Sequence, residues 1–362
     1  EAHYNLATLQ AEMDDAVSAE ASYRQALRLK PGLAQAANNL ANLLDARGER
    51  DEAIALLQSA LTANPTLAQA WGTLGYLLLA SNRLDAAEHA LARAVSLDSG
   101  MADAWANLAE SRRQRKDAEG AREAYEALLR VDPSAEVARF HLATLNGQTP
   151  SQPPDEYVRH IFDGMAEEFD HRLVDVLGYR LPYELARHLD GVLHAPASLD
   201  VLDLGCGTGL SGEAIKPWAK RLHGVDLSPR MLARAQARQV YDALYEGEII
   251  AFCAQCQDSD WDLLLATDVL VYLGSLEGLF GQARRLLRHG GRLLLSIEEL
   301  DTDEDYVLQP TGRYAHRSSY LERLAADHGF IMERNERIPL RSEGGSMLQG
   351  RLLRFVALPV AG

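Results

Sequence analysis

The sequence predicts two folds in succession: an all-α array of stacked helix pairs, and then an α/β domain built on a mostly parallel sheet. Two observations lead to this prediction. Residues 1 to about 132 repeat with a period of 34, and from Leu199 onward short apolar runs alternate with helical segments. The length of 362 residues gives room for two ordinary domains, and an apolar content of 47% is typical of packed protein.

Small and apolar residues recur at the interval of 34. Pro31, Pro65 and Pro133 differ by one or two periods, and Ser99-Gly100 occupies the missing step. The expected first helices share a tryptophan or alanine followed three positions later by leucine: Trp71 and Leu74, Trp105 and Leu108, Ala37 and Leu40. The expected second helices share an alanine followed four positions later by a larger apolar residue: Ala19 and Tyr23, Ala53 and Leu57, Ala87 and Leu91, Ala121 and Tyr125. Such helix pairs cannot bury their apolar faces alone, so they stack.

This pattern resembles the tetratricopeptide repeat, with Trp71-Gly72-Thr73-Leu74-Gly75 as its clearest copy. The resemblance implies a solenoid over residues 1–147, closed by a last helix from Ala135 to about Asn146. It also implies a concave surface that binds a protein or peptide; spacing or dimerisation of the second domain is the alternative. The chain opens inside a repeat, which favours further repeats upstream.

A proline-rich segment separates the two expected domains. Residues 147–154 read Gly-Gln-Thr-Pro-Ser-Gln-Pro-Pro, a composition typical of a connector. We therefore expect a linker at residues 148–156, stiffened by its prolines, and the α/β domain at residues 157–362.

A glycine-rich turn follows the first apolar strand. Residues 199–204 suit the middle of a parallel sheet, and Gly205-Cys206-Gly207-Thr208-Gly209 comes next, before a helix from Leu210. Glycines let the backbone turn tightly and approach a ligand, and a helix N-terminus adds unpaired N–H groups. A nicotinamide dinucleotide is the alternative ligand, but its G-x-G-x-x-G fingerprint would need a third glycine at Leu210.

The segment from Asp203 to Gly209 instead resembles motif I of the class I methyltransferases that use S-adenosyl-L-methionine. Asp226 ends a second strand about 20 residues later, where a carboxylate can accept both hydroxyls of a ribose. The stretch that begins at Asp226 also resembles the D-x-S-x-x-M-L segment of the family. The resemblance implies that Leu227 and Met231 pack on adenine.

The later segments complete the expected Rossmann-like sheet, which the resemblance implies is seven-stranded. A weak third strand at residues 244–248 ends in Glu248, which would reach the adenine amino group, and a fourth strand at residues 261–268 ends in Asp268. Residues 288–296 resemble the turn and fifth strand that methyltransferases usually write as L-x-P-G-G, with His289 in place of the proline. A helix at 319–328, a strand from Phe330 and a final strand at 351–358 follow.

Residues 157–170, before the first strand, resemble the F-D-x-x-A-x-x-[FY]-D segment of small-molecule methyltransferases and of bacterial tetratricopeptide–methyltransferase fusions. The resemblance implies a lid helix that covers the cofactor and excludes water; an amphipathic helix packed on the sheet is the alternative. The expected cofactor-binding residues are Asp203, Gly205, Cys206, Gly207, Gly209, Asp226, Leu227, Met231, Glu248, Asp268 and Phe169.

Asp268 and Tyr272 follow the fourth strand at the carboxyl edge of the sheet, where open parallel sheets bind ligands. We expect these two residues to be catalytic, together with His316 as a base. A packed or solvated role is the alternative for each of them. A carboxylate on the methyl acceptor would be held by arginine, and the candidates are Arg313, Arg317 and Arg341.

Charge and cysteine content argue against several classes of function. The net charge is −16, and residues 1–147 alone hold 20 acidic and 14 basic side chains, so no basic stripe for nucleic acid is present. No apolar run reaches the roughly 18 residues of a membrane span. Cys253 and Cys256 lack the two further ligands of a structural zinc, so no metal is expected. Three cysteines suit a reducing compartment, which favours a cytoplasmic location.

Three functions remain open. The first is a methyltransferase whose repeats recruit a protein or peptide substrate or a pathway partner. The second is a small-molecule carboxylate O-methyltransferase, similar to trans-aconitate methyltransferase, whose repeats serve assembly. The third is a catalytically silent interaction protein that binds S-adenosyl-L-methionine, against which the intact Asp203–Gly209 motif and Asp226 argue.

Overall fold

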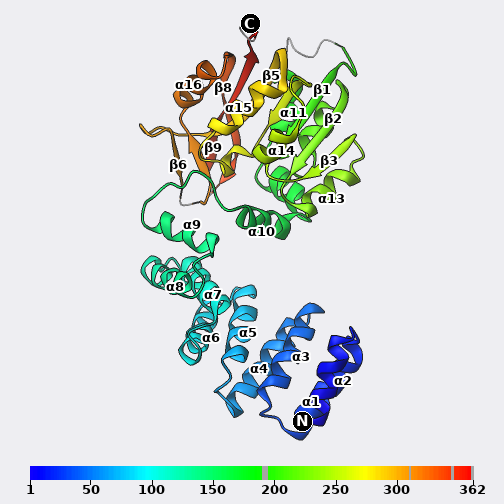
Figure 1. The fold of residues 1–362 in the computed structure, drawn as a ribbon, viewed down its shortest axis with the longest axis vertical. Coiled ribbons are helices and arrows are strands. Elements are labelled where there is room, and N and C mark those ends of the chain that lie inside the picture. Colours follow the sequence, from blue (N-terminus) through cyan, green and yellow to red (C-terminus); the bar gives the residue numbers. More distant parts are fainter. Residues whose placement is uncertain (190–194, 310, 344–345, 360–362) are drawn as a thin grey trace. The chain divides into compact units, whose positions relative to one another are not determined.

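The computed structural model describes residues 1–189, 195–309, 311–343 and 346–359. Contacts within the chain divide it into two compact units, Glu1–Gly147 and Gln148–Gly362 (Figure 1). The first unit is helical and the second is α/β, so the predicted succession of fold classes is confirmed.

The first unit consists of helix pairs that follow one another along the chain. Each helix contacts its neighbours in sequence. The first helix α5 also contacts the first helices on either side, α3 and α7, so these three form one continuous side of the array. The helices are α1 (Ala2–Glu12), α2 (Ala16–Leu29), α3 (Ala34–Ala46), α4 (Arg50–Ala63), α5 (Ala68–Ala80), α6 (Leu84–Leu97), α7 (Ala102–Gln114), α8 (Ala118–Val131) and α9 (Glu136–Leu145).

The period of 34 is visible in the backbone and in the core of this unit. A left-handed residue ends the first helix of each pair: Asp14, Gly48, Asn82 and Lys116, with φ of 60°, 81°, 57° and 63°. The alanines expected at the helix crossings, Ala19, Ala53, Ala87 and Ala121, are all fully buried. Trp71 Nε1 and Trp105 Nε1 each donate to a backbone carbonyl six residues earlier, at 3.0 Å. The repeat therefore fixes turns, crossings and side-chain contacts alike.

One glycine permits a close contact between two helices of the array. A Cβ on Gly75 would lie 2.4 Å from Leu91 Cγ, so α5 and α6 approach each other only because no side chain is present there.

The second unit is built on a sheet with the order β3-β2-β1-β4-β5-β7-β6, in which β9 pairs antiparallel with β5 and β8 with β9. Strands β1 to β5 are mutually parallel. The strands are β1 (Leu199–Leu204), β2 (Ala219–Asp226), β3 (Ala243–Glu246), β4 (Trp261–Ala266), β5 (Leu287–Glu299), β6 (Tyr306–Leu308), β7 (Tyr314–His316), β8 (Phe330–Glu343) and β9 (Ser346–Ala357). Among the described residues the sheet has nine strands. The expectation of seven was wrong, because the segment after β5 adds the short antiparallel pair β6–β7.

Helices cover both faces of this sheet. Alternate residues of β1 enter different cores: Val201 packs with α11 and α12, whereas Leu202 and Leu204 pack with α14, α15 and α16. The helical segments are α10 (Asp155–Met165), η1 (His171–Val176), α11 (Leu181–His188), α12 (Leu210–Ile215), α13 (Pro229–Ala237), α14 (Ile249–Gln255), η2 (Leu270–Tyr272), α15 (Glu277–Leu286) and α16 (Ser318–Asp327). No helix in the described ranges is long and apolar enough to span a membrane.

The proline-rich segment expected to be a linker lies against the second unit. The carbonyl oxygen of Ser151 accepts hydrogen bonds from the backbone N–H groups of Gly274 (3.0 Å) and Ser275 (2.9 Å). The carbonyl oxygen of Pro150 accepts one from the Tyr314 hydroxyl at 2.9 Å. We call residues 150–154 the strap.

Candidate functional site

The parallel strands bring several loops to one edge of the sheet. Because β1 to β4 run in the same direction, the turn after β1, Asp226 at the end of β2, Glu248 after β3 and Asp268 after β4 all lie at their carboxyl ends. Such an edge is where open parallel sheets bind ligands.

The glycine turn needs its glycines for backbone conformation and for space. Gly205, Gly207 and Gly209 have φ of 70°, 53° and 90°, in the left-handed region that side chains disfavour. A Cβ on Gly205 would lie 2.3 Å from Val269 Cγ2, so the turn also runs close to the loop after β4. The Gly207 N–H donates to Asp226 Oδ2 at 2.8 Å, which joins this turn to the end of β2.

Asp226 is held by backbone donors on both oxygens. Oδ2 accepts from Gly207 N, and Oδ1 accepts from Ser228 N at 2.9 Å. Burial raises the pKa of Asp226, and these backbone donors oppose the rise. Each carboxylate oxygen can accept a second hydrogen bond, so a fixed carboxylate remains available to two donors of a ligand.

A mostly apolar cavity of about 1010 Å³, including its open mouth, adjoins these loops. Six parts of the second unit line the cavity. The parts before β1 are the strap (Gln152, Pro153), α10 and the residues after it (Asp155, Val158, Phe162, Phe169, Leu173), and the start of α11 with the residue pair before it (Tyr179, Pro182). The parts after β1 are the glycine turn and α12 (Gly205, Cys206, Gly207, Thr208, Leu210, Ser211), the end of β2 and the segments after β2 and β3 (Asp226, Leu227, Gly247, Glu248, Ile249), and the segment after β4 (Thr267, Asp268, Val269, Tyr272, Leu273).

A charged network lies beside the cavity at the end of β4. Arg341, on β8, is 2% exposed; its Nη1 lies 2.9 Å from Asp268 Oδ1, and its Nη2 bonds Glu298 of β5. Burial raises the pKa of Asp268, whereas Arg341 and Arg313 act to lower it. Burial also raises the pKa of Tyr272, which therefore presents a neutral hydroxyl at this end of the cavity.

Three residues of the segment expected to form a lid line the cavity: Val158, Phe162 and Phe169. Arg159 Nε donates to the Leu227 carbonyl at 3.2 Å, and the Ser228 hydroxyl donates to Asp163. At the other end, Asp170 accepts hydrogen bonds from the Thr208 hydroxyl and from Arg238. Aromatic rings also pack against one another here: Phe162 with Tyr272 (5.0 Å between ring centroids) and Phe162 with Phe169 (6.1 Å). The segment is thus joined to both ends of the site.

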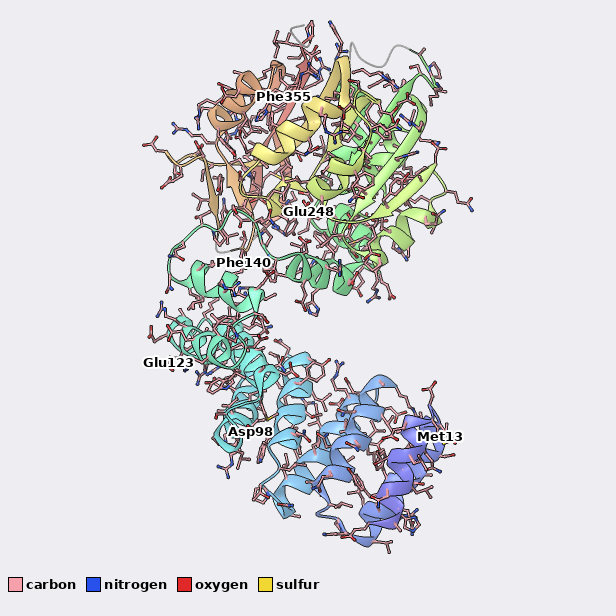
Figure 2. All side chains as sticks on the ribbon, viewed as in Figure 1. Met13, Asp98, Glu123, Phe140, Glu248 and Phe355 are labelled. Carbon is pink, nitrogen blue, oxygen red and sulfur yellow. The ribbon has the colours of Figure 1, made fainter. Side chains whose placement is uncertain are left out.

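Nine of the predicted site residues line the cavity: Gly205, Cys206, Gly207, Asp226, Leu227, Glu248, Asp268, Phe169 and Tyr272. For two of these residues, the surroundings restrict what the side chain can contribute. Glu248, labelled in Figure 2, accepts hydrogen bonds from the Ile250 and Ala251 N–H groups as the N-cap of α14, so its carboxylate is already engaged. Burial raises the pKa of the Cys206 thiol well above its usual value, so this thiol stays protonated.

The other four predicted residues are not among those that line the cavity. Asp203 is 1% exposed and accepts a hydrogen bond from the Tyr241 hydroxyl at 2.7 Å. Gly209 is the N-cap of α12, and Met231 is fully buried in α13, where it packs within the fold. His316 is fully buried on β7, with Nε2 2.9 Å from the Gly274 carbonyl. Burial lowers the pKa of His316 to about 4, so the geometry does not support its expected role as a base in the cavity.

Three features of the site were absent from the sequence prediction. Tyr179 lines the cavity, the strap forms part of its wall, and Tyr241 lies behind the glycine turn. No motif marks these residues, because their places depend on contacts between distant segments. Two of the arginines proposed to hold a carboxylate lie in different surroundings. Arg341 lies in the charged network, whereas Arg317 pairs with Asp303 at the surface.

Comparisons with known proteins agree with this geometry. A family model described as a methyltransferase domain matches residues 202–295, and tetratricopeptide-repeat models match residues 4–68, 73–136 and 46–95. The malonyl-[acyl-carrier protein] O-methyltransferase of Herminiimonas arsenicoxydans is 35% identical over 115 residues, which cover 31% of this chain and 42% of that protein. Methyltransferase-like protein 27 of Homo sapiens is 40% identical over 87 residues, which cover 24% of this chain and 35% of that protein.

The chain therefore spans less than half the length of either relative. Among solved structures, magnesium protoporphyrin IX methyltransferase of Synechocystis PCC 6803 with bound SAH has a TM-score of 0.44 at 19% identity, and the match covers 56% of this chain and 100% of that one. The matched families thus identify tetratricopeptide repeats within residues 4–136 and a methyltransferase domain at residues 202–295 of this chain.

Proposed function

We propose that the chain transfers the methyl group of S-adenosyl-L-methionine to an acceptor bound in the cavity of the second unit. The observation that carries this proposal is the hydrogen bond between Gly207 N and Asp226 Oδ2 at the cavity wall. It holds a glycine turn and a carboxylate side by side, as a ligand with a methionine end and a ribose would require. In the transfer, the acceptor's electron pair bonds to the methyl carbon while the sulfur–carbon bond breaks toward sulfur, leaving a neutral thioether.

The lining residues divide by the part of the donor that each would hold. Gly205, Cys206 and Gly207 are proposed to hold the methionine end, and Asp226 the ribose hydroxyls. Leu227 and Glu248 would adjoin the adenine. Since Glu248 already caps α14, its contact with adenine would use the remaining acceptor capacity of its oxygens.

Water exclusion and alignment are the protein's main contributions to such a displacement, because the sulfonium is already activated. Phe169 and Phe162, in the segment expected to form a lid, are proposed to exclude water. Asp268 and Tyr272 would orient the acceptor at the end of β4. The pKa of Tyr272 is raised by burial, so its hydroxyl acts as a hydrogen-bond donor rather than as a phenolate.

The repeats are proposed to recruit the acceptor as part of a protein or peptide. Asn42 and Tyr76 occupy equivalent positions one period apart on the side formed by the first helices, and both are exposed. One turn before Asn42, Asn38 is 9% exposed, and its Oδ1 accepts no hydrogen bond from a described residue. Amide side chains that alternate with an exposed aromatic ring can bind the backbone and an apolar side chain of a peptide.

Methylation of a small carboxylate is the second candidate, with the repeats serving assembly. It is favoured by the donors near Asp268, the Tyr272 hydroxyl and the Arg313 guanidinium, because a carboxylate only accepts hydrogen bonds. One relative is by its name a malonyl-[acyl-carrier protein] O-methyltransferase. A carboxylate is already a nucleophile, so this reaction needs no base such as His316. A cytoplasmic location stays a prediction under either candidate.

Donor binding is tested by calorimetric titration of S-adenosyl-L-methionine against the wild type and Asp226→Ala. We expect the variant to bind about 10- to 100-fold more weakly, since it loses hydrogen bonds to a charged group. Asp175→Ala, at an exposed carboxylate on η1, serves as the control and should bind like the wild type. Unchanged affinity in Asp226→Ala would refute the ribose assignment.

The acceptor is identified with a donor labelled on its methyl group. Incubation with a cell lysate, followed by separation into protein and small-molecule fractions, distinguishes the two candidates. Label in protein supports recruitment through the repeats, and label in organic acids supports the second candidate. If the wild type binds the donor but no fraction is labelled, the silent interaction protein is favoured instead.

A further inference from the structure

Three glycines from three different elements have the same neighbour. A Cβ on Gly212 of α12 would lie 2.1 Å from the Tyr241 hydroxyl oxygen. A Cβ on Gly224 of β2 would lie 2.9 Å from Tyr241 Cε1, and one on Gly209 would lie 3.0 Å from Tyr241 Cε2. The ring of Tyr241 therefore occupies the space that these glycines leave open behind the glycine turn.

Tyr241 reaches this place from the segment between α13 and β3. Gln239 turns the chain there with φ of 56°, and Arg238 donates from Nε to the Thr208 carbonyl of the glycine turn at 2.7 Å. The Tyr241 hydroxyl then donates to Asp203 Oδ2 at 2.7 Å. The segment thus contacts the glycine turn through Arg238 and the end of β1 through Tyr241.

Asp203 is a buried carboxylate with few charged neighbours of opposite sign. Burial raises its pKa to about 7; the hydrogen bond from Tyr241 lowers it, and Asp226 on β2 raises it further. Asp203 also lies near two groups that are neutral at pH 7. These are the Cys206 thiol of the glycine turn and the Tyr179 phenol, which precedes α11. Of these groups, the phenol of Tyr241 favours the charged form of Asp203.

We propose that Tyr241 is a positioning residue of the donor site, whose hydroxyl fixes the Asp203 carboxylate behind the glycine turn and keeps it charged when the donor binds. This inference rests on the proposed binding of S-adenosyl-L-methionine in the adjoining cavity. The donor carries a sulfonium and an ammonium, and a negative charge behind the turn attracts both. The demethylated product keeps the ammonium but has a neutral thioether, so it gains less from the same carboxylate.

Two measurable consequences follow from this difference in charge. Donor affinity should fall as the pH drops through the pKa of Asp203, because the protonated carboxyl no longer attracts a cation. The preference for the donor over the demethylated product should fall over the same range. A residue that only fills space would change neither the midpoint of the pH profile nor the preference.

The test is calorimetric titration of wild type and Tyr241→Phe with S-adenosyl-L-methionine and with S-adenosyl-homocysteine from pH 6 to pH 9. Tyr241→Phe keeps the ring among the three glycines and removes only the hydroxyl. We expect its midpoint for donor affinity to move up by about one pH unit, the usual scale for loss of a hydrogen bond to a charged group. At pH 9 its affinities should return to within about twofold of the wild type, since Asp203 is then ionised in both proteins.

Two further variants serve as a control and as the second arm of a double-mutant cycle. Tyr245→Phe removes the hydroxyl of a nearby tyrosine on β3, which lies 3.4 Å from His223 Nδ1, and should behave as the wild type. Asp203→Asn should lose the pH dependence near 7, and adding Tyr241→Phe to it should leave the remaining profile unchanged.

Two results would overturn the proposal. One is a midpoint in Tyr241→Phe equal to that of the wild type and of Tyr245→Phe. The other is an equal loss of affinity for both ligands at every pH, which indicates a role in packing alone. If Asp203→Asn does not fold, the comparison of Tyr241→Phe with Tyr245→Phe decides the matter by itself. Failure of the wild type to bind the donor at any pH would instead refute the proposed function.

Discussion

Burial determines which single side chains are charged in the second unit, and His316 gives the clearest case. Its ring is fully buried on β7 and Nε2 bonds the Gly274 carbonyl, so the pKa falls from 6.5 to about 4. Between those values the unfolded chain binds a proton that the folded chain does not. The stability contributed by His316 is therefore complete above about pH 6.5 and is lost as the pH falls toward 4.

We expect His316→Gln to be less stable than the wild type at pH 7.5, and this deficit to shrink by about 2 kcal/mol at pH 5, because glutamine does not titrate. Urea denaturation of both proteins at the two pH values measures the difference. The comparison with wild type at each pH is needed because Asp203, whose pKa is raised to about 7, changes stability in the opposite direction. His171→Gln, at an exposed histidine, is the control; an equal deficit for His316→Gln at both pH values would contradict the prediction.

Arg341 is the buried charge on which two carboxylates depend. We expect Arg341→Met to destabilise the fold by about 3–5 kcal/mol, because Asp268 and Glu298 would lose the buried guanidinium that bonds both of them. Arg337→Met, on the same strand, is the matched control. Its side chain is 59% exposed and lies 3.0 Å from Glu299, so its loss should cost under about 1 kcal/mol. Similar losses in the two variants, measured by chemical denaturation, would show that burial is not the cause.

At the scale of elements, the crossing of α5 and α6 depends on the absence of one Cβ. Gly75→Ala places a methyl group against Leu91, and we expect a loss of about 1–3 kcal/mol from overpacking. Gly72→Ala on the same helix is the control, because its Cβ would meet the flexible end of Met101 at 3.0 Å and Ala94 Cβ at an ordinary 4.0 Å, and alanine favours helix. Circular dichroism during thermal unfolding measures both. Partial recovery in Gly75→Ala with Leu91→Ala is expected; equal losses in the two single variants would contradict the crossing as the cause.

Elements with a local sequence pattern were the ones that could be predicted. The helix pairs follow from a period of 34 that fixes Ala53 and Ala87 at crossings, and β1 and β4 follow from buried apolar runs. The strands β6 and β7 have three residues each, too few for any periodicity, and they form only because they pair with each other and β7 with β5. That is why the sheet exceeds the expected seven strands.

The site divides in the same way between motif and tertiary contact. Gly207 and Asp226 could be predicted, since a glycine turn and a carboxylate at strand ends have a required spacing. The position of Met231 could not, because helix α13 buries that side chain rather than turning it toward the cavity. His316 could not either, because its surroundings come from the pairing of β6 and β7 and from the Gly274 carbonyl.

At the scale of the whole molecule, the strap follows the repeats along the chain and forms part of the cavity wall in the second unit. Gln152 and Pro153 line the cavity, and the Ser151 carbonyl accepts from Gly274 and Ser275, next to the Tyr272 end of the site. The segment that follows the repeats is therefore a part of the second unit rather than a free connector. Removal of the repeats and removal of the strap should have separate effects.

Two truncations separate these effects. A chain that starts at Gln148 keeps the strap, and we expect it to bind S-adenosyl-L-methionine as the full chain does but to lose methylation of a protein acceptor. A chain that starts at Asp155 lacks the acceptor of the Gly274 and Ser275 N–H groups and part of the cavity wall, so its donor affinity should fall about 5- to 20-fold. Tyr314→Phe in the full chain removes only the hydrogen bond to the Pro150 carbonyl. Its donor affinity should lie between the affinities of the two truncated chains, because the backbone contacts of Ser151 remain.

Calorimetry measures donor affinity, and transfer of a labelled methyl group measures methylation of the acceptor. Equal donor affinity in both truncated chains would exclude the strap from the site, and full methylation of the protein acceptor without residues 1–147 would exclude recruitment by the repeats.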